Sequence, residues 1–333
     1  MDIYKKFTRD VVLVGITQTV VRLRGLILLP ILAKTLGASG YGIWSLAMVT
    51  IYFLAPIAGL GLNQAMVRFL AGERDREKIR EGFCSIILLI SVSAGMVGVF
   101  LYISSGFLAT EFFSDAKSVQ IIQIASAILI LWVLDNTFLT YFRTFRQMEK
   151  YSFSFMGATI VEVLLITIMV FSGHGLLGAV NALLISRLIF FIVLLGVISN
   201  EISFKIPRFT YIKKYLRFSI PLIPVGIFGW VIDAADRYII GFYLTSAAVG
   251  IYSASYNIGA VITAFMSPIG FVLYPALSKL WEEGKTRELE NHLKYSLKYF
   301  LMLSIPSFFG LSMLSKQILR ILARPDFVSE GYG

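Results

Sequence analysis

The sequence has few charged residues and almost none of the side chains that bind metals or form disulfides. Charged residues make up 15% of the 333-residue chain, whereas a soluble domain usually carries about 25%. The single cysteine, Cys84, excludes a disulfide within the chain. Together with the only two histidines, His174 and His292, it provides too few ligands for a four-coordinate Cys/His zinc site. No cofactor is therefore expected, and a coupling ion is left unidentified.

Signatures of catalysis are missing as well. The chain contains no phosphate-cradling P-loop, no GxSxG nucleophile elbow and no HExxH metal pair. These absences disfavour an enzyme, although membrane glycosyl polymerases and ligases lack strong local motifs. Such enzymes would be expected to have sizeable external loops.

What the chain has in abundance is apolar residues, which make up 57% of it and give a mean hydropathy of +0.78. A helix needs about 20 apolar residues to cross a bilayer. Windows of that length recur nine times, at 11–34, 41–66, 83–108, 119–142, 152–172, 176–198, 219–243, 249–275 and 296–315. The sequence therefore predicts an all-α polytopic membrane protein with about nine transmembrane helices.

The basic residues alternate between the connections of these windows. Of the 30 Lys and Arg residues, 21 lie in one set of connections and 5 in the other. Because basic residues stay on the cytoplasmic side, this split predicts a multi-pass protein of the cytoplasmic membrane with a cytoplasmic N-terminus. The net charge of +10 then reflects topology, and no nucleic-acid partner is expected. The outer connections are too short to hold an external catalytic domain.

The remaining basic residues lie inside the expected spans, where four acidic residues join them. The eight intramembrane charges are Arg22, Arg24, Asp135, Glu162, Arg187, Asp233, Asp236 and Arg237. Glu162 and Arg187 stand at matching depth on antiparallel neighbours, which predicts a structural ion pair because intramembrane charges commonly pair. Asp233 and Arg237 are four residues apart and can pair along one helix, with Asp236 beside them. A structural role and a cavity role stay open for this second group.

The first window carries a polar, narrow stripe. Gly15, Gln18, Arg22 and Gly25 follow helical spacing, whereas Arg24 is rotated by about 200° from Arg22. We therefore expect Arg22 to line a cavity and Arg24 to be structural. Asp135 could form an ion pair with either arginine. A guanidinium in such a cavity suits a phosphate or carboxylate. The candidates for contact with a substrate are Gln18, Arg22, Arg24, Asp135, Asp233, Asp236 and Arg237.

A weak internal repeat suggests how the helices are organised. Shifting the sequence by 208 residues places LGASGYGIWSLA, residues 36–47, over LTSAAVGIYSAS, residues 244–255. This predicts an N-lobe of six helices over residues 1–208 and a C-lobe over residues 209–333 with three. The last three helices of a six-plus-six repeat would be absent, so residues 1–333 alone are expected to transport weakly. A complete nine-helix protein is the alternative.

Several stretches resemble a known family. VVRLRGLILLPILAKTLGASGYGIWSLA and GLNQAMVRFLAG are similar to the start of the polysaccharide transporter family, which includes the lipid-linked oligosaccharide flippases. SIPLIPVGIFGWVIDAADRYIIGFYLTSAAVGIYSASYNIGAVI resembles the opening of that family's second lobe. The family lies within the multidrug/oligosaccharidyl-lipid/polysaccharide exporter superfamily, and the resemblance covers nearly the whole chain.

The resemblance implies two facing six-helix bundles around a central cavity. It also implies an activity, which is translocation of a polyprenyl-pyrophosphate-linked oligosaccharide to the outer leaflet by alternating access, without nucleotide hydrolysis. Related flippases of peptidoglycan precursors use cavity arginines from several helices, whereas the second and eighth windows have none at mid-depth. The alternatives are a cation-coupled multidrug extruder of the same superfamily, a membrane glycosyl polymerase or ligase, and an inactive scaffold.

Overall fold

The chain is helical along nearly all of the part that the structure, a computed structural model, describes. That part comprises residues 3–113, 115, 118–202, 205–260, 262, 277, 280, 281 and 284–330. Its helices are α1 (Ile3–Ala58), α2 (Leu62–Leu70), α3 (Arg76–Ile103), α4 (Ser105–Glu111), α5 (Ser118–Thr144), α6 (Met148–Met169), the π-helical turn η1 (Val170–His174), α7 (Gly175–Ser199), α8 (Ile212–Ser219), the 3-10 turn η2 (Ile220–Leu222), α9 (Ile223–Tyr243), α10 (Ser246–Gly259), α12 (Thr286–Leu322) and α13 (Pro325–Glu330). These residues include no strand, and the predicted all-α class is confirmed.

Six helical stretches of the described chain are long and apolar enough to cross a membrane. They are Val12–Ala58, Arg76–Ile103, Ser118–Thr144, Met148–Ser199, Ile212–Tyr243 and Thr286–Leu322. The protein is therefore a multi-pass membrane protein, as the composition predicts. The count of nine helices stays a prediction.

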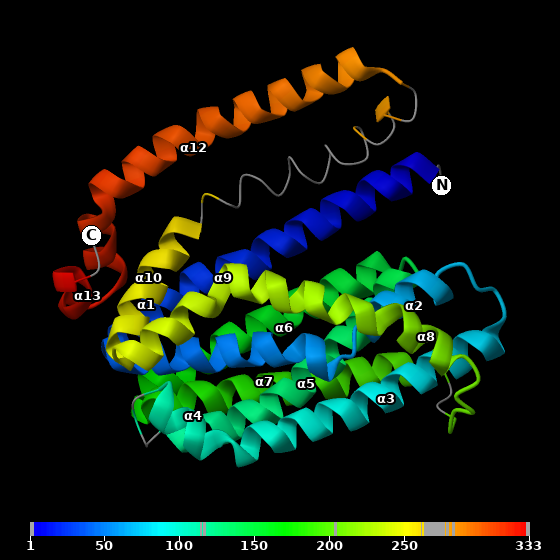
Figure 1. The fold of residues 1–333 in the computed structure, drawn as a ribbon, viewed down its shortest axis with the longest axis horizontal. Helices are drawn as coiled ribbons and strands as arrows, with labels where there is room; N and C mark the ends of the chain where they lie inside the picture. Colours follow the sequence, from blue (N-terminus) through cyan, green and yellow to red (C-terminus); the bar gives the residue numbers. More distant parts are fainter. Residues whose placement is uncertain are drawn as a thin grey trace. The chain divides into compact units, whose positions relative to one another are not determined.

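Two of these stretches are too long for one crossing, and glycines divide each of them. Val12–Ala58 has 47 residues, which at about 1.5 Å per residue is more than twice the thickness of the hydrocarbon core. Gly37 breaks it with φ 71° and ψ −178°, a conformation almost confined to glycine. Gly173 and Gly175, with φ of 84° and 57°, break Met148–Ser199. Both breaks fall in expected outer turns, and Figure 1 shows α1 turning back on itself.

One window ends differently from what the sequence predicts. The window 41–66 was expected to be one helix, but α1 ends at Ala58 and α2 starts at Leu62. The reason is local, because Leu60 and Gly61 have φ of 50° and 63°, which no helix tolerates. The window 249–275 begins within α10, but most of its second half lies outside the described residues.

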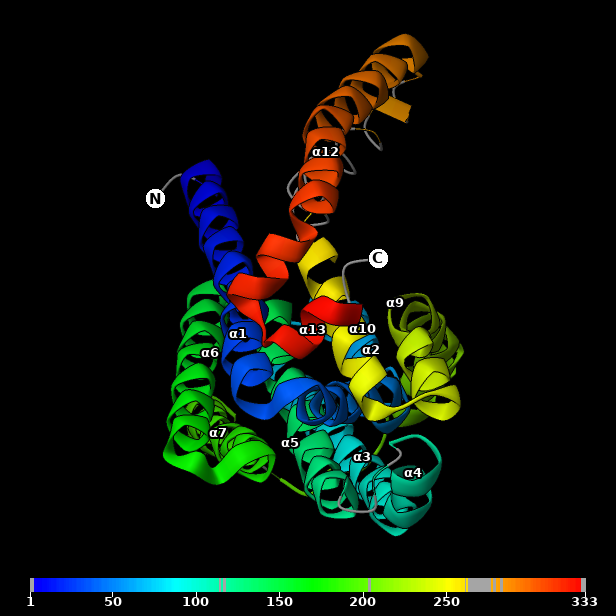
Figure 2. The ribbon, with the colours of Figure 1, turned by 90° about the vertical axis from the view of Figure 1, so that its left-hand side faces the viewer.

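The described chain forms two compact units, Met1–Gly250 and Ile251–Gly333. In the first unit α5 is central, since it packs against α1, α2, α3, α4, α6 and α7, as Figure 2 shows for several of these helices. In the second unit α12 packs against α13. The lobe boundary at residue 208 was derived from the internal repeat. The two compact units do not test it, and it stays a prediction.

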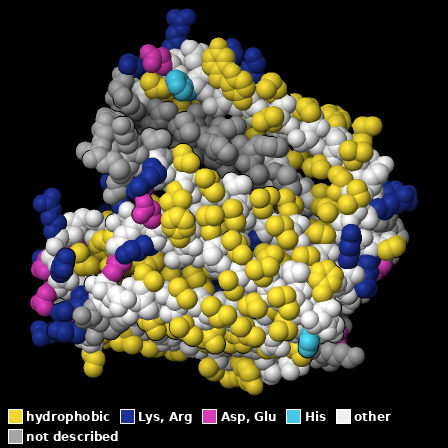
Figure 3. Space-filling view, turned by 180° about the vertical axis from the view of Figure 1, so that it is seen from behind, with side chains coloured by type: hydrophobic (Ala, Val, Ile, Leu, Met, Phe, Trp, Pro, Cys, Tyr) yellow, Lys and Arg dark blue, Asp and Glu magenta, His cyan; other side chains and the backbone are white. Residues whose placement is uncertain are grey.

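The outer surface of the bundle is apolar. On α3, the side chains of Met96, Phe100 and Ile103 are 64%, 65% and 76% exposed. Figure 3 shows hydrophobic side chains over the middle of the visible face, with Lys and Arg side chains gathered toward its ends. Such a surface fits lipid contact, because a soluble monomer rarely exposes large continuous apolar patches.

Candidate functional site

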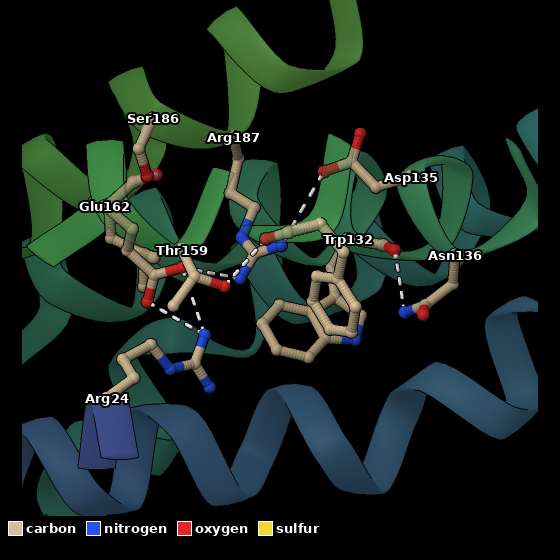
Figure 4. A network of polar contacts seen from close by, with 10 residues as sticks. Arg24, Trp132, Asp135, Asn136, Thr159, Glu162, Ser186 and Arg187 are labelled. Atoms are coloured by element: carbon tan, nitrogen blue, oxygen red, sulfur yellow. Dashed lines mark hydrogen bonds and ion pairs between the residues drawn. The ribbon is translucent and has the colours of Figure 1, made fainter. Parts of the chain in front are cut away.

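Four charged side chains from four helices meet inside the first unit (Figure 4). Glu162 of α6 is at their centre. It accepts hydrogen bonds from Arg24 Nη1 of α1 at 3.1 Å to both oxygens, and from Arg187 Nη2 of α7 at 2.8 Å. The side chains of Glu162 and Arg187 are only 6% and 7% exposed. Because little water screens these ions, their attraction is stronger than that of a surface pair.

Asp135 of α5 is the fourth charged residue, and we call Arg24, Asp135, Glu162 and Arg187 the four-charge cluster. Trp132, also on α5, lies beside it. Asp135 Oδ2 lies 3.8 Å from Arg187 Nη1, and neither oxygen accepts a hydrogen bond from the described residues. Arg187 Cζ lies 4.1 Å from the centroid of the Trp132 ring, within cation–π range. Trp132 in turn meets Tyr52 edge to face at 5.2 Å. Arg187 is thus surrounded by two carboxylates and one ring.

The sequence anticipates part of this cluster. The expected ion pair between Glu162 and Arg187 is present. The expectation that Asp135 answers Arg22 or Arg24 is wrong, because its ion pair is with Arg187 while Arg24 reaches Glu162. Trp132 was missed, since a tryptophan in an apolar helix gives no signal in the sequence beyond its hydrophobicity.

The polar stripe of α1 faces open space. Gly15, Gln18, Arg22 and Gly25 are all exposed, and a Cβ added to either glycine would meet no atom within 4 Å. Gln18 Nε2 donates to the Tyr151 hydroxyl on α6 at 3.1 Å. Arg22 has no hydrogen-bond or ion-pair partner among the described residues. The two arginines of this helix therefore have opposite surroundings, with Arg24 paired and Arg22 unpaired.

The charges of α9 pair differently from the expected i, i+4 arrangement. Arg237 is buried and donates from Nη1 to the backbone oxygen of Asp233 at 2.8 Å. Its ion pair is with Asp236, with 3.3 Å between Nη1 and Oδ1. The Asp233 carboxylate is exposed. The expected side-chain pair of Asp233 with Arg237 is wrong, because the guanidinium folds back to its own helix backbone.

A second feature of the first unit is a close crossing of α1 with the start of α10. A Cβ added to Gly42 would lie 1.7 Å from the Ser246 oxygen, and one added to Gly250 would lie 2.0 Å from the Ala38 oxygen. The Ser39 and Ser246 hydroxyl oxygens are 3.0 Å apart and hydrogen-bonded. We call these five residues the α1–α10 crossing. Small residues four apart on both helices allow the backbones to touch.

The crossing is reciprocal. The shift of 208 residues that aligns the repeat pairs Ala38 with Ser246 and Gly42 with Gly250. In the structure Gly42 faces Ser246 and Gly250 faces Ala38, so each copy presents the same two positions to the other. A contact of this kind is typical of a two-fold axis. The repeat was visible in the sequence, whereas the contact between its copies was not.

Comparison with known proteins finds a family, curated relatives and solved structures that are similar to this chain. Residues 7–281 match the family described as polysaccharide biosynthesis protein. A probable low-salt glycan biosynthesis flippase, Agl15, of Haloferax volcanii is 24% identical over 84% of this chain and 65% of its own length. A putative O-antigen transporter of Shigella flexneri is 24% identical over 83% of this chain and 66% of its own. The chain spans less than two thirds of the length of these relatives.

Solved structures share the fold. The inward-closed lipid II flippase MurJ superposes with a TM-score of 0.68 at 20% identity, covering 95% of this chain and 70% of that one. The inward-facing conformation of a multidrug resistance MATE family transporter gives a TM-score of 0.70 at 14% identity, covering 92% of this chain and 74% of that one. At these identities the likeness concerns the fold alone.

Proposed function

We propose that this chain, which belongs to the polysaccharide biosynthesis protein family, moves a polyprenyl-pyrophosphate-linked oligosaccharide across the cytoplasmic membrane. The relatives named as a glycan flippase and an O-antigen transporter support a flippase role. The substrate passes from the cytoplasmic to the outer leaflet by alternating access. The N-terminus of the protein lies in the cytoplasm, in keeping with the distribution of Lys and Arg.

The observation that carries alternating access is the α1–α10 crossing. It lies at the turns that the basic residues assign to the outer side, and it joins the two repeat copies. The five residues of the crossing are glycine, alanine or serine, so that their own separation exposes little apolar surface. At about 25 cal/mol per Å² of apolar area, opening a contact of glycine, alanine and serine costs far less than opening an interface of large side chains. The crossing therefore acts as an outer gate.

Arg22 is the residue we assign to the substrate's phosphates. An arginine at mid-span costs about 2.5 to 3.5 kcal/mol by translocon scales, and Arg22 has no protein partner in the described chain to offset that cost. A pyrophosphate offers a bidentate partner of opposite charge. Gly15 and Gly25 keep the stripe narrow, so that a large headgroup can approach Gln18 and Arg22. Asp233, exposed on α9, is assigned to the opposite wall of the passage.

The gate is tested by crosslinking. Ser39→Cys and Ser246→Cys are combined in a Cys84→Ser background, because the two hydroxyl oxygens are 3.0 Å apart and a disulfide of about 2.05 Å needs only a small shift. In proteoliposomes carrying a fluorescent lipid-linked oligosaccharide, we expect oxidation to reduce flipping more than tenfold and dithiothreitol to restore it.

The two single-cysteine variants, oxidised in parallel, are the controls. If the oxidised pair carries one disulfide per molecule and still flips the lipid at the rate of the single variants, the gate does not open during transport. If the reduced protein moves no lipid-linked oligosaccharide but exchanges cationic drugs, the proposed substrate is wrong.

A further inference from the structure

Cations and aromatic rings also gather between α2 and α8, apart from the four-charge cluster. Lys214 Nζ lies 4.7 Å from the centroid of the Phe69 ring. Arg68 Cζ lies 4.7 Å from the Phe218 ring and 5.9 Å from the same Phe69 ring. Phe69 also stacks on Tyr215 at 5.4 Å and meets Phe218 edge to face at 5.5 Å. One ring is therefore shared by two cations from two helices, a group that we call the α2–α8 cluster.

No carboxylate in the described part of the chain forms an ion pair with these two cations. Arg68 and Lys214 are exposed, and neither has an ion pair among the described residues. The nearby carboxylates are otherwise engaged. Glu73 accepts from the backbone N–H groups of Arg74 and Asp75, and Glu81 accepts from those of Arg208 and Thr210. The hydrogen bonds from Asp75 and Arg74 lower the pKa of Glu73, which keeps it ionised and committed to the backbone.

The placement of α8 suits a membrane surface. Its buried residues Tyr215 and Ser219 lie on one face, while Lys213, Lys214 and Arg217 are exposed. The helix leads directly into the span that ends at Tyr243. By the topology expected from the sequence, this is the cytoplasmic boundary of the bilayer. A short amphipathic helix with a basic face is typical of segments that lie in the headgroup region.

We infer that Arg68 and Lys214 bind the phosphate of an anionic phospholipid, such as phosphatidylglycerol, in the cytoplasmic leaflet. Cation–π contacts hold both side chains beside Phe69, which brings two unpaired positive charges to one ring. Juxtamembrane basic residues contribute about 1 kcal/mol each to binding of anionic lipid. The bound headgroup ties α8 to α2. This site is separate from the transported substrate and does not depend on the proposed function.

The test uses the purified chain, exchanged into nanodiscs of phosphatidylcholine with increasing fractions of phosphatidylglycerol. Retained phosphatidylglycerol is counted by native mass spectrometry, and thermal unfolding is followed in parallel. We expect the double variant Arg68→Gln, Lys214→Gln to bind phosphatidylglycerol about 25-fold more weakly, at about fivefold for each lost cation. Binding of phosphatidylcholine should not change.

The matched control is Lys294→Gln, Lys298→Gln on α12, which removes the same charge from two exposed positions. Phe69→Leu keeps both charges and removes the shared ring, and it should weaken binding severalfold. If the control and the double variant lose phosphatidylglycerol binding equally, the loss is due to net charge alone and the proposed site is wrong. Saturation by inorganic pyrophosphate with no preference for phosphatidylglycerol would overturn the lipid as its occupant. Neither readout requires transport, so a failed flippase assay leaves this inference standing.

Discussion

The four-charge cluster and the α2–α8 cluster are both rich in arginine or lysine, yet they treat their cations in opposite ways. In the first, each guanidinium has a carboxylate within 4 Å, and every member except Arg24 is less than a tenth exposed. In the second, the cations are exposed and have rings where carboxylates would be expected. A buried cation without a counter-charge would destabilise the fold, whereas an exposed one is free to attract an anion. The presence or absence of a carboxylate partner therefore distinguishes cations that stabilise the fold from cations that are available to bind a ligand.

The largest effect should come from breaking the matched cluster at its centre. Glu162→Gln leaves the buried Arg187 with Asp135 as its remaining carboxylate and takes from Arg24 the carboxylate that it contacts. Removing one partner of a buried ion pair typically costs about 3–5 kcal/mol. We expect a large fall in the midpoint of thermal unfolding in detergent and a low yield of folded protein.

Glu149→Gln on the same helix is the control for Glu162→Gln. Glu149 pairs with Arg9 at 2.7 Å, but the two side chains are 55% and 50% exposed. Exposed pairs contribute about 0.2–1 kcal/mol, so the midpoint should barely move. Equal shifts for Glu162→Gln and Glu149→Gln would mean that burial of the cluster does not strengthen it.

A smaller effect is expected at Trp132. Trp132→Leu keeps an apolar side chain beside Arg187 and removes the ring 4.1 Å from its Cζ atom. A desolvated cation–π contact is worth about 2 kcal/mol. Thermal unfolding should report a loss of that size in the wild-type background. The loss should shrink in an Arg187→Met background, and an unchanged loss there would mean that Trp132 acts through packing alone.

The sequence predicts most of what local chemistry determines. Glycines at 37, 173 and 175 mark the turns because only glycine adopts their backbone angles easily. Glu162 and Arg187 were paired from their depth alone, since antiparallel spans place equal depths side by side. The exposed stripe that contains Arg22 follows from helical spacing.

The sequence does not predict which partner a long side chain selects. Arg24 reaches Glu162 on α6, and Arg237 folds back to a backbone oxygen, because these choices depend on how the helices pack in three dimensions. The reciprocal contact of Gly42 and Gly250 needs the crossing of two helices about 200 residues apart in sequence. Aromatic partners such as Trp132 and Phe69 look like any lipid-facing or core residue.

The most direct test of the account compares the two arginines of α1 in one flipping assay, with rates divided by the amount of folded protein. Arg22→Ala should leave thermal unfolding unchanged and reduce flipping of the lipid-linked oligosaccharide by about 10- to 100-fold. This loss corresponds to one charge-assisted hydrogen bond of about 1.5–3 kcal/mol. Arg22→Lys should flip at a rate between those of the wild type and Arg22→Ala. Arg24→Ala should lower stability while the folded fraction keeps flipping. Normal flipping by both Arg22 variants, with flipping lost from folded Arg24→Ala, would contradict the assignment of the unmatched arginine to the substrate.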